Sequence, residues 1–271
     1  MHAARARLAA TSRNPRRDAE LLLARVLGSD QAALLTHPER MLLPAEADQF
    51  ERLLKRRLAS EPIQYITGTQ EFFGLLFEVS PDVLIPRPET EHLVEAVLER
   101  FGRAADSRLV DVGTGSGAIA VALAHAMPRA RITAVDCSIA ALKIAQGNAQ
   151  RHGVTERITF LQSDLLASVE GEDFDVVVSN PPYIAAGESL EPQVYNYEPH
   201  SALFAGSSGL EVFERLIPQA RRILKVGGWL MVEMGHGQMP ALQRLLSGWG
   251  QVRFISDLQG IPRVAEARLL Q

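Results

Sequence analysis

The segment whose residue types are best suited to chemistry is Asn180-Pro-Pro-Tyr183. It follows Phe174–Ser179, an apolar run typical of a buried parallel strand. The segment is therefore expected at the carboxyl end of a strand, where open α/β sheets bind ligands. Proline fixes its own φ and has no N–H, and a residue before proline is pushed toward extended geometry. These constraints predict a rigid turn that is rich in hydrogen-bond acceptors.

Such a turn is suited to holding a planar amino group. The Asn180 side-chain oxygen and the Pro181 carbonyl could accept the two hydrogens of one NH2 group, with the Tyr183 ring against the planar group that carries it. A plain proline-rich turn is the alternative interpretation. The sequence therefore indicates Asn180, Pro181 and Tyr183 as candidate catalytic residues, and all of 180–183, Pro182 included, as the candidate acceptor site.

A second candidate site is the glycine-rich turn at 113–117, which follows the apolar run Leu109–Val112. Glycine is needed where the backbone bends sharply and lets a ligand approach closely. The spacing differs from that of the usual dinucleotide loop, because Ala118 stands where that pattern has its third glycine. A loop that binds S-adenosylmethionine holds no pyrophosphate, so it does not need the full dinucleotide pattern.

Acidic residues near the ends of three predicted strands fit other parts of the same donor. Asp111, just before the glycines, suits an ammonium group, and Asp136 could accept hydrogen bonds from both ribose hydroxyls. Asp164 ends the next strand and could receive an exocyclic adenine NH2. Simpler interpretations are a helix cap for Asp136 and a turn residue for Asp164.

These sites need a sheet to position them, and the chain beyond residue 85 alternates strand and helix patterns. Helices of about 10 to 15 residues between successive strands imply right-handed crossovers and a mostly parallel sheet. The last two strands are joined by 257–263 alone, which is too short for a crossover helix, so that pair is expected to be antiparallel. This is the outline of a class I methyltransferase domain. The predicted strands are 108–112, 131–136, 157–162, 174–179, 228–234, 251–256 and 264–270, and the predicted helices are 117–127, 138–152, 209–225 and 237–248.

A smaller helical domain is predicted ahead of this sheet, over residues 1–62, because apolar residues recur at helical spacing from about Arg16 to Leu58. Between 63 and 84, β-branched and aromatic residues with two intervening glycines predict a β-hairpin linker. The catalytic domain would then comprise residues 85–271. Near its start, Thr90 and its acidic neighbours are expected to cap a helix.

Composition and charge narrow the class of protein. With 46% hydrophobic and 22% charged residues among 271, the chain is an ordinary globular protein rather than a disordered or fibrous one. A formal net charge of −4 argues against a protein that binds chiefly by neutralising many phosphates. The single cysteine, Cys137, excludes a multi-cysteine metal site and fits a reducing compartment, and we expect it to be buried. The sequence has no apolar run of membrane-span length and no secretion signal, so a cytoplasmic protein is expected. We also expect no bound metal.

The chain resembles the HemK/PrmC family of protein-(glutamine-N5) methyltransferases, which modify peptide chain release factors. The resemblance extends over nearly the whole chain and is most specific at 61–91. It rests on Arg16-Arg-Asp-Ala-Glu-Leu-Leu-Leu23, Glu61-Pro-Ile-Gln-Tyr-Ile-Thr-Gly68, Glu71-Phe-Phe-Gly74, Ile85-Pro-Arg-Pro-Glu-Thr-Glu91, Asp111-Val-Gly-Thr-Gly-Ser-Gly-Ala118, Asn180-Pro-Pro-Tyr183, Glu198-Pro199 and Arg263-Val264.

This resemblance implies a Rossmann-like α/β fold with a seven-stranded, mostly parallel sheet and one antiparallel strand, preceded by a helical substrate-docking domain. It implies protein methylation in translation termination: S-adenosylmethionine gives a methyl group to the glutamine of a Gly-Gly-Gln motif in a class I release factor, and S-adenosylhomocysteine leaves. Some members have an aromatic residue where this chain has Leu165, which bears on donor affinity. The expected donor-binding residues are Asp111, Gly113, Thr114, Gly115, Ser116, Gly117, Asp136, Asp164, Leu165 and Asn180.

Two other functions stay open at this point. An adenine-N6 or guanine-N2 nucleic-acid methyltransferase would hold its planar NH2 group in the same way. The acidic balance, the absence of an evident basic stripe and the little room for a target-recognition domain after residue 180 argue against it, so we expect no direct nucleic-acid partner. We also expect a monomer. A non-catalytic donor-binding protein of the same fold is the other alternative, and the intact tetrad argues against that.

Overall fold

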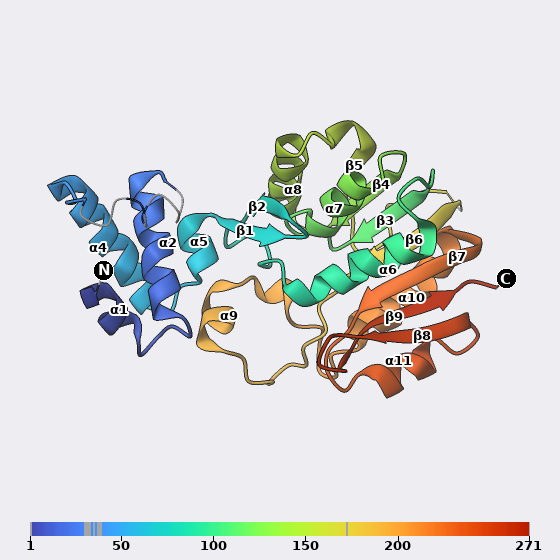
Figure 1. Ribbon diagram of the computed structural model, residues 1–271. Helices are drawn as coiled ribbons and strands as arrows, with labels where there is room; N and C mark the ends of the chain where they lie inside the picture. The colour runs from blue at the N-terminus through green and yellow to red at the C-terminus, as the bar shows by residue number, and fades with distance from the viewer. Residues whose placement is uncertain (1, 30–33, 35, 37–39, 172, 271) are drawn as a thin grey trace. The chain divides into compact units, whose positions relative to one another are not determined.

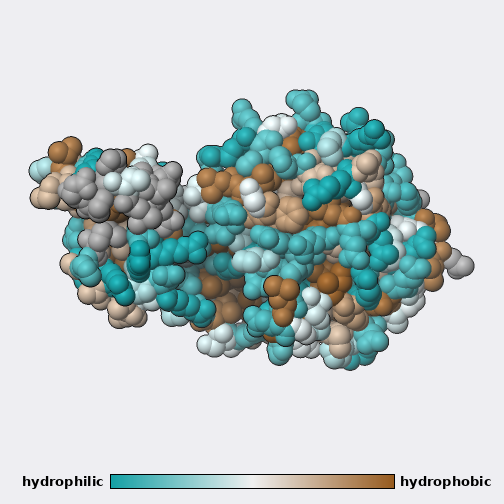
Figure 2. Space-filling view, viewed as in Figure 1, coloured by the Kyte–Doolittle hydropathy of each residue, from teal (hydrophilic) through white to brown (hydrophobic). Residues whose placement is uncertain are grey.

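The computed structural model describes residues 2–29, 34, 36, 40–171 and 173–270, and the chain divides into two compact units (Figure 1). The first unit comprises Met1–Thr69 together with Leu190–Tyr197, and the second comprises Gln70–Ser189 together with Glu198–Gln271. The chain therefore leaves the second unit shortly after the Asn-Pro-Pro-Tyr tetrad and returns to it at Glu198. On the face shown in Figure 2, hydrophilic and hydrophobic residues are interspersed over the surface of each unit.

The first unit is built from helices, as the helical spacing predicts. Their apolar faces meet in a small core that includes Leu8, Leu22 and Leu54. Beside this core a buried ion pair joins Arg57 Nε to Asp18 Oδ2 at 2.7 Å. The described helices of this unit are α1 (His2–Leu8), α2 (Pro15–Leu27), α4 (Pro44–Leu58), α5 (Ile63–Thr67) and α9 (Pro192–Tyr197).

The segment at 190–197 joins this unit from far along the chain, which the sequence patterns do not predict. The Tyr197 hydroxyl donates a 2.8 Å hydrogen bond to the Ala59 carbonyl, and Arg13 forms an ion pair with Glu191. These contacts tie the segment that follows the tetrad to the helical unit by polar side chains, which carry no periodic signal.

The predicted hairpin linker at 63–84 is wrong over its first residues. Ile63–Thr67 forms helix α5, because Pro62 begins it and Gly68, at φ 80°, ends it with a left-handed cap whose N–H donates to Gln64 at 2.7 Å. The helix start at Pro62 and the helix stop at Gly68 outweigh the strand preference of the β-branched residues between them. The hairpin itself is shorter, with strands β1 (Thr69–Phe72) and β2 (Leu75–Glu78).

The second unit contains the predicted seven-stranded sheet, in the order β5-β4-β3-β6-β7-β9-β8. Parallel pairing joins the first five strands in this order, and β9 is antiparallel to both β7 and β8. A mostly parallel sheet with one antiparallel strand is therefore confirmed. The strands are β3 (Arg108–Val112), β4 (Arg131–Asp136), β5 (Ile158–Gln162), β6 (Phe174–Ser179), β7 (Leu224–Glu233), β8 (Gly250–Ser256) and β9 (Pro262–Arg268).

Helices pack on both faces of this sheet, and successive strand residues point to opposite faces. Leu109 of β3 belongs to the core under helices α6 (Glu91–Phe101), α7 (Ala118–Ala126) and α8 (Ile139–Arg151). Its neighbour Val110 belongs to the opposite core, under α10 (Glu211–Ile223) and α11 (Met239–Leu245). Near-continuous apolar strands are thus explained by burial on both faces.

The remaining described features bear on two expectations from the sequence. Cys137 is exposed rather than buried, because it follows Asp136 at the end of β4, where the chain leaves the sheet. No helix among the described residues is long and apolar enough to cross a membrane.

Candidate active site

The strand order places the two candidate motifs next to each other. From β3 the chain proceeds outward to β4 and β5 and then returns to β6 on the other side of β3. The carboxyl ends of β3 and β6 therefore flank the switch point where open α/β sheets bind ligands. Val112 is in register with Ser179, and the Ser179 hydroxyl donates to the Val112 carbonyl at 2.7 Å.

The glycine-rich turn after β3 depends on glycine for its conformation. Gly113, Gly115 and Gly117 have φ values of 71°, 55° and 80°, in the left-handed region that other residues rarely adopt. A Cβ on Gly117 would also lie 3.0 Å from Cβ of Ala145 in α8. The N–H groups of Gly113 and Thr114 both donate to the Val135 carbonyl at 2.9 Å, which fixes the turn to β4. Ser116, also predicted as a donor contact, is buried and its carbonyl accepts from Asn148 at 2.9 Å.

Asp111 lies under this turn and holds it in place. Its Oδ2 accepts hydrogen bonds from Thr114 Oγ1 at 2.6 Å and from the Ala120 N–H at 3.1 Å. Its Oδ1 is buried and has no hydrogen-bond partner among the described residues. Burial raises the pKa of this carboxyl to about 7, against the opposing effect of both hydrogen bonds. The predicted contact with an ammonium group stays a prediction, for which Oδ1 is the remaining acceptor.

Asp136 is half-buried at the end of β4, where it organises the same loop from the side. Its Oδ2 accepts from the Gly115 N–H and its Oδ1 from the Ser138 N–H, both at 2.9 Å. The helix cap of α8 is Ser138, whose hydroxyl accepts from the Ala141 N–H at 3.2 Å. Because each carboxylate oxygen has a second lone pair, the predicted ribose contact is compatible with these hydrogen bonds and stays a prediction.

The predicted adenine end of the site is more open. Asp164 is exposed and forms an ion pair with Arg215 of α10. Leu165 is partly buried against the core beneath α10 and has a φ of 52°, in the left-handed region. A non-glycine residue in that region marks local strain, which concentrates at ligand sites. The predicted contacts of Asp164 and Leu165 with adenine stay predictions.

On the acceptor side, two tetrad residues are held by side chains from distant parts of the chain. Asn180 Nδ2 donates to Thr90 Oγ1 at 3.0 Å, so Thr90 holds the nitrogen end of this side-chain amide. The Tyr183 hydroxyl donates to Glu233 Oε1 at 3.3 Å. Gln238 holds the backbone here, since its Nε2 donates to the Tyr183 carbonyl at 2.9 Å. The tetrad is thus fixed at its first and last residues.

Glu233 ends β7 as a buried acid, with 2% of its surface exposed. Its Oε2 is buried and has no hydrogen-bond partner among the described residues. Burial raises its pKa to about 7, although interactions with the Thr90 and Tyr183 hydroxyls favour the ionised form. Burial likewise raises the pKa of the Tyr183 hydroxyl, so this phenol stays protonated.

The segment at 85–91 contributes several contacts to the acceptor side of the site. Arg87 forms an ion pair with buried Glu198, whose Oε2 also accepts from the Ile85 N–H at 3.1 Å. Glu91 accepts a 2.8 Å hydrogen bond from the Phe73 N–H of the hairpin turn. Thr90 is the N-cap residue of α6, as expected, but its side chain makes no cap hydrogen bond and accepts from Asn180 instead.

The sequence did not indicate Glu233 or Gln238 as functional residues. It indicated Thr90 only as a helix cap, and not as a partner of Asn180. Glu233 ends an apolar strand and Gln238 lies just before α11, so local spacing gives neither a distinctive signal. An acid at the buried carboxyl end of a predicted strand next to the tetrad strand was the one available clue.

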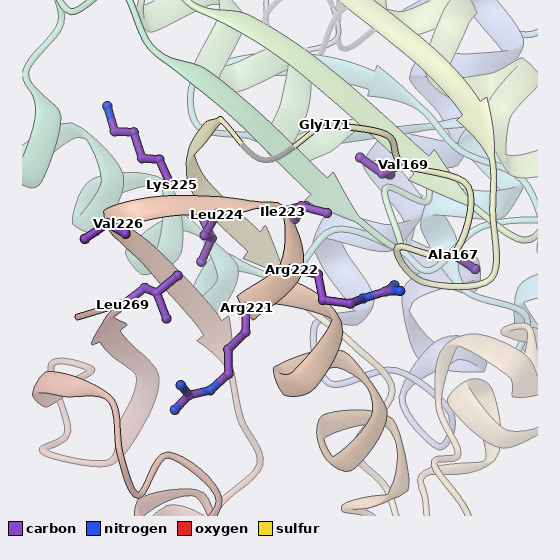
Figure 3. A pocket seen from close by; sticks show the side chains of 10 residues that line it. All are labelled: Ala167, Val169, Gly171, Arg221, Arg222, Ile223, Leu224, Lys225, Val226 and Leu269. Atoms are coloured by element: carbon purple, nitrogen blue, oxygen red, sulfur yellow. The ribbon is translucent and has the colours of Figure 1, made fainter. Parts of the chain in front are cut away.

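A described pocket of about 540 Å³ lies elsewhere, at the amino end of β7 (Figure 3). Arg221 and Arg222 lie in the last turn of α10 and Lys225 is the second residue of β7. The other side is formed by the loop before β6, with Ala167, Val169 and Gly171. It contains none of the predicted site residues, so its volume does not mark the chemistry. Among the described residues, no three of the His, Cys, Asp and Glu side chains are grouped as metal ligands would be.

Comparison with known proteins agrees with this geometry. Residues 1–68 match the PrmC N-terminal domain, and residues 89–196 match the methyltransferase small domain. The release factor glutamine methyltransferase of Koribacter versatilis is 47% identical over 263 residues, which cover 96% of this chain and 93% of that protein. The chain belongs to the release factor glutamine methyltransferase family. The family member of Geobacter sulfurreducens is 43% identical, over 94% of this chain and 90% of its own length.

A solved structure supports the fold of the second unit. The T. thermophilus 16S rRNA N2 methyltransferase in complex with AdoMet and guanosine is similar with a TM-score of 0.55 and 21% identity. The match covers 74% of this chain and 49% of that one. At this identity the likeness shows the class I methyltransferase fold and carries no statement about the substrate.

Proposed function

We propose that this protein transfers a methyl group from S-adenosylmethionine to the side-chain nitrogen N5 of the glutamine in the Gly-Gly-Gln motif of class I peptide chain release factors. Family membership supports the reaction class. The observation that carries the assignment is the hydrogen bond from Asn180 Nδ2 to Thr90, which leaves Asn180 Oδ1 to accept from a substrate amide. A primary amide is the uncharged protein side-chain group that presents a planar NH2.

The residues at the end of β3 and β4 fit a bound S-adenosylmethionine. The glycine turn has three left-handed residues, and a Cβ on Gly113 or Gly115 would meet no side chain, so a ligand can approach the backbone there. Asp111 has a buried, unpartnered oxygen that an ammonium group would satisfy. Asp136 and Leu165 would contact the ribose and adenine. When bound, this donor supplies an electrophilic methyl group.

On the acceptor side the protein must make a weak nucleophile react. An amide nitrogen is unreactive because its lone pair is delocalised into the carbonyl, as in a peptide bond. If Asn180 Oδ1 and the Pro181 carbonyl accept both N–H hydrogens, electron density on nitrogen rises and its lone pair is directed at the methyl group. Orientation of this kind can contribute up to about 7–11 kcal/mol. Methyl transfer leaves an N-methylated amide cation, which is strongly acidic and releases one N–H proton readily to give the neutral methylamide, so no side-chain base is needed.

Tyr183 would form one wall of this acceptor site, with its ring against the planar amide. Its hydroxyl is fixed by Glu233 and its carbonyl by Gln238. The ring also packs on Gly235, where an added Cβ would lie 3.0 Å from Tyr183 Cδ2. These contacts fix the hydroxyl, one ring edge and the backbone of Tyr183.

The test is methyl transfer from labelled S-adenosylmethionine to a purified class I release factor, unmethylated duplex DNA and ribosomal RNA, in separate reactions. We expect label on the release factor alone, mapped by mass spectrometry to the glutamine of Gly-Gly-Gln. A release factor with asparagine in place of that glutamine, and the enzyme variant Asn180→Ala, are the controls and should stay unlabelled. Label on nucleic acid alone would support the runner-up, an amino-group nucleic-acid methyltransferase.

The location of the protein, its oligomeric state and its partners belong to the same proposal. We propose that the protein acts in the cytoplasm as a monomer, that its helical unit docks the release factor, and that nucleic acid is not a direct partner. The net charge of −4 and the mixed hydrophilic and hydrophobic surface of the helical unit in Figure 2 support protein docking over phosphate binding. Light scattering on the purified chain, alone and with release factor, would measure the oligomeric state and the stoichiometry.

A further inference from the structure

We infer that Thr90 and Glu233 are positioning residues that fix which end of the Asn180 side-chain amide faces the acceptor. The inference rests on the proposed function and deepens it. Both residues lie in the catalytic unit, on the 3-10 turn η1 (Pro88–Thr90) and at the end of β7.

The site needs such a device because an asparagine amide has two ends of nearly the same shape and opposite hydrogen-bonding character. With Oδ1 toward the acceptor, Asn180 accepts an N–H hydrogen from the substrate glutamine. Rotated by half a turn, it would present its own N–H hydrogens to another NH2 group, and the two donors would repel. Nothing in the covalent structure of Asn180 selects between these states.

Thr90 makes the first part of the selection. Its Oγ1 accepts the hydrogen bond from Asn180 Nδ2 at 3.0 Å, and the residue is 4% exposed, so bulk water does not compete for the hydroxyl. A hydroxyl alone is not selective, however, because it can donate to an amide oxygen as readily as it accepts from an amide nitrogen. The one hydrogen of Thr90 must therefore be engaged elsewhere.

Glu233 supplies the second part. Its carboxyl interacts with the Thr90 hydroxyl and accepts from the Tyr183 hydroxyl at 3.3 Å. An ionised carboxylate only accepts, so it draws the Thr90 hydrogen toward itself. Oγ1 then offers only lone pairs to Asn180, which must respond with its Nδ2. Glu233 in this way favours the state in which Thr90 Oγ1 accepts, and the Asn180 Nδ2 group is then the one that donates to it.

The burial of this acid is hard to explain by stability alone. A carboxyl with 2% exposure and one oxygen without a hydrogen bond costs free energy of folding that an apolar residue would not. The charged groups that act on it from the neighbouring elements are Glu89 of η1, which opposes its ionisation, and Arg263 of β9, which favours it. The Tyr183 hydroxyl donates to this acid, and the Thr90 hydroxyl favours its ionised form.

The experiment compares Thr90→Val, which removes the hydroxyl at nearly constant shape, with Thr90→Ser, which keeps it. We expect Thr90→Val to lower kcat at least about tenfold, with donor affinity and the KM for release factor little changed, and Thr90→Ser to recover most of kcat. Thr159→Val, at an exposed threonine of β5, is the control for loss of a hydroxyl away from the site. A loss of kcat of less than about twofold in Thr90→Val, or an equal loss in both Thr90 variants, would overturn the inference.

Glu233→Gln is the second variant, and it keeps the test decisive if Thr90→Val does not fold. A glutamine amide can donate to Thr90, which frees the threonine hydrogen to bond to Asn180 Oδ1. We expect kcat to fall at least about fivefold without loss of donor affinity, and kcat to lose the increase with pH that ionisation of Glu233 gives the wild type. An unchanged kcat and pH profile would contradict the role of Glu233.

A readout without substrate separates this inference from the proposed function. The side-chain ¹⁵NH2 signals of Asn180, assigned with Asn180→Ala, report the hydrogen bond to Thr90. They should shift in Thr90→Val and Glu233→Gln and stay close to wild type in Thr90→Ser. Unmoved signals in the first two variants would refute the inference even if release factor is methylated. If wild type labels nucleic acid instead, the proposed function fails, while these signals still decide the orientation of Asn180.

Discussion

The two halves of the candidate active site are organised in different ways. In the donor half, carboxylates hold nearby backbone N–H groups, such as Asp136 with Gly115 and Asp111 with Ala120, over separations of 21 and 9 residues. In the acceptor half, side chains hold side chains over longer separations, 90 residues for Asn180 with Thr90 and 50 for Tyr183 with Glu233. The donor half is therefore a local property of the sequence, whereas the acceptor half is assembled by the fold.

The largest difference between the halves should come from Asn180→Ala. We expect kcat on release factor to fall at least about 100-fold, because the amide oxygen that holds the reacting NH2 group is lost. Donor affinity, measured by calorimetry, should change little, since the glycine turn and Asp136 are untouched. A near-normal kcat would remove Asn180 from the mechanism, and a parallel loss of donor affinity would mean that the two halves are not separable.

Each half also contains one buried acid whose pKa is raised to about 7, Asp111 on the donor side and Glu233 on the acceptor side. The folded protein thus binds these protons more tightly than the unfolded chain does. Between the unfolded pKa near 4.5 and about 7, the free energy of unfolding should fall as pH rises, by up to about 3 kcal/mol for Glu233. Below this range both states are protonated and the effect vanishes.

Glu233→Gln separates the contribution of the acceptor side. The fall in stability between about pH 5 and about pH 8, measured by urea unfolding, should be smaller in the variant than in wild type. Asp111 contributes equally to both proteins, so it cancels in the comparison. An equal fall in both proteins would show that Glu233 does not ionise in this range.

Asp136→Ala probes the donor half. We expect donor affinity to fall at least about tenfold, because both the predicted ribose contact and the anchor of the Gly115 N–H are removed. The saturating kcat should fall less than in Asn180→Ala. Asp136→Asn, which keeps the shape and one acceptor oxygen, should lie between wild type and the alanine variant. Unchanged affinity in calorimetry would reduce Asp136 to a residue that only shapes the loop.

The same contrast explains what the sequence could predict. The donor half is visible because a strand, a glycine turn and a helix follow one another, and each strand of the sheet carries its own apolar pattern. The antiparallel pair was predicted from loop length alone. In contrast, Thr90 has the spacing of a helix cap, and only the packing of η1 beside β6 turns its hydroxyl to Asn180.

Two errors in predicting the helices have different origins, one local and one in long-range packing. Helix α5 was expected as a strand because five residues between Pro62 and Gly68 are too few for a periodic signal. Helix α9 was missed because its contacts, such as Tyr197 with Ala59, are made to residues more than a hundred positions away. Glu233 shows the limit most clearly, because an acid that ends an apolar strand is usually at the surface.

The smallest expected effect tests whether the acceptor half is as tightly packed as its contacts indicate. Gly235→Ala would place a Cβ 3.0 Å from Tyr183 Cδ2 and 3.1 Å from Gln238 Oε1, so the ring must shift by a few tenths of an ångström. We expect kcat to fall about threefold to tenfold with unchanged donor affinity.

The matched control is Gly147→Ala in the middle of α8, where an added Cβ has no neighbour within 4 Å. It should leave activity unchanged and raise stability by about 0.5–1 kcal/mol, because alanine favours a helix interior more than glycine does. If Gly235→Ala also keeps full activity, the Tyr183 ring has room to move, and the acceptor half is held by Thr90 and Asn180 rather than by the aromatic wall.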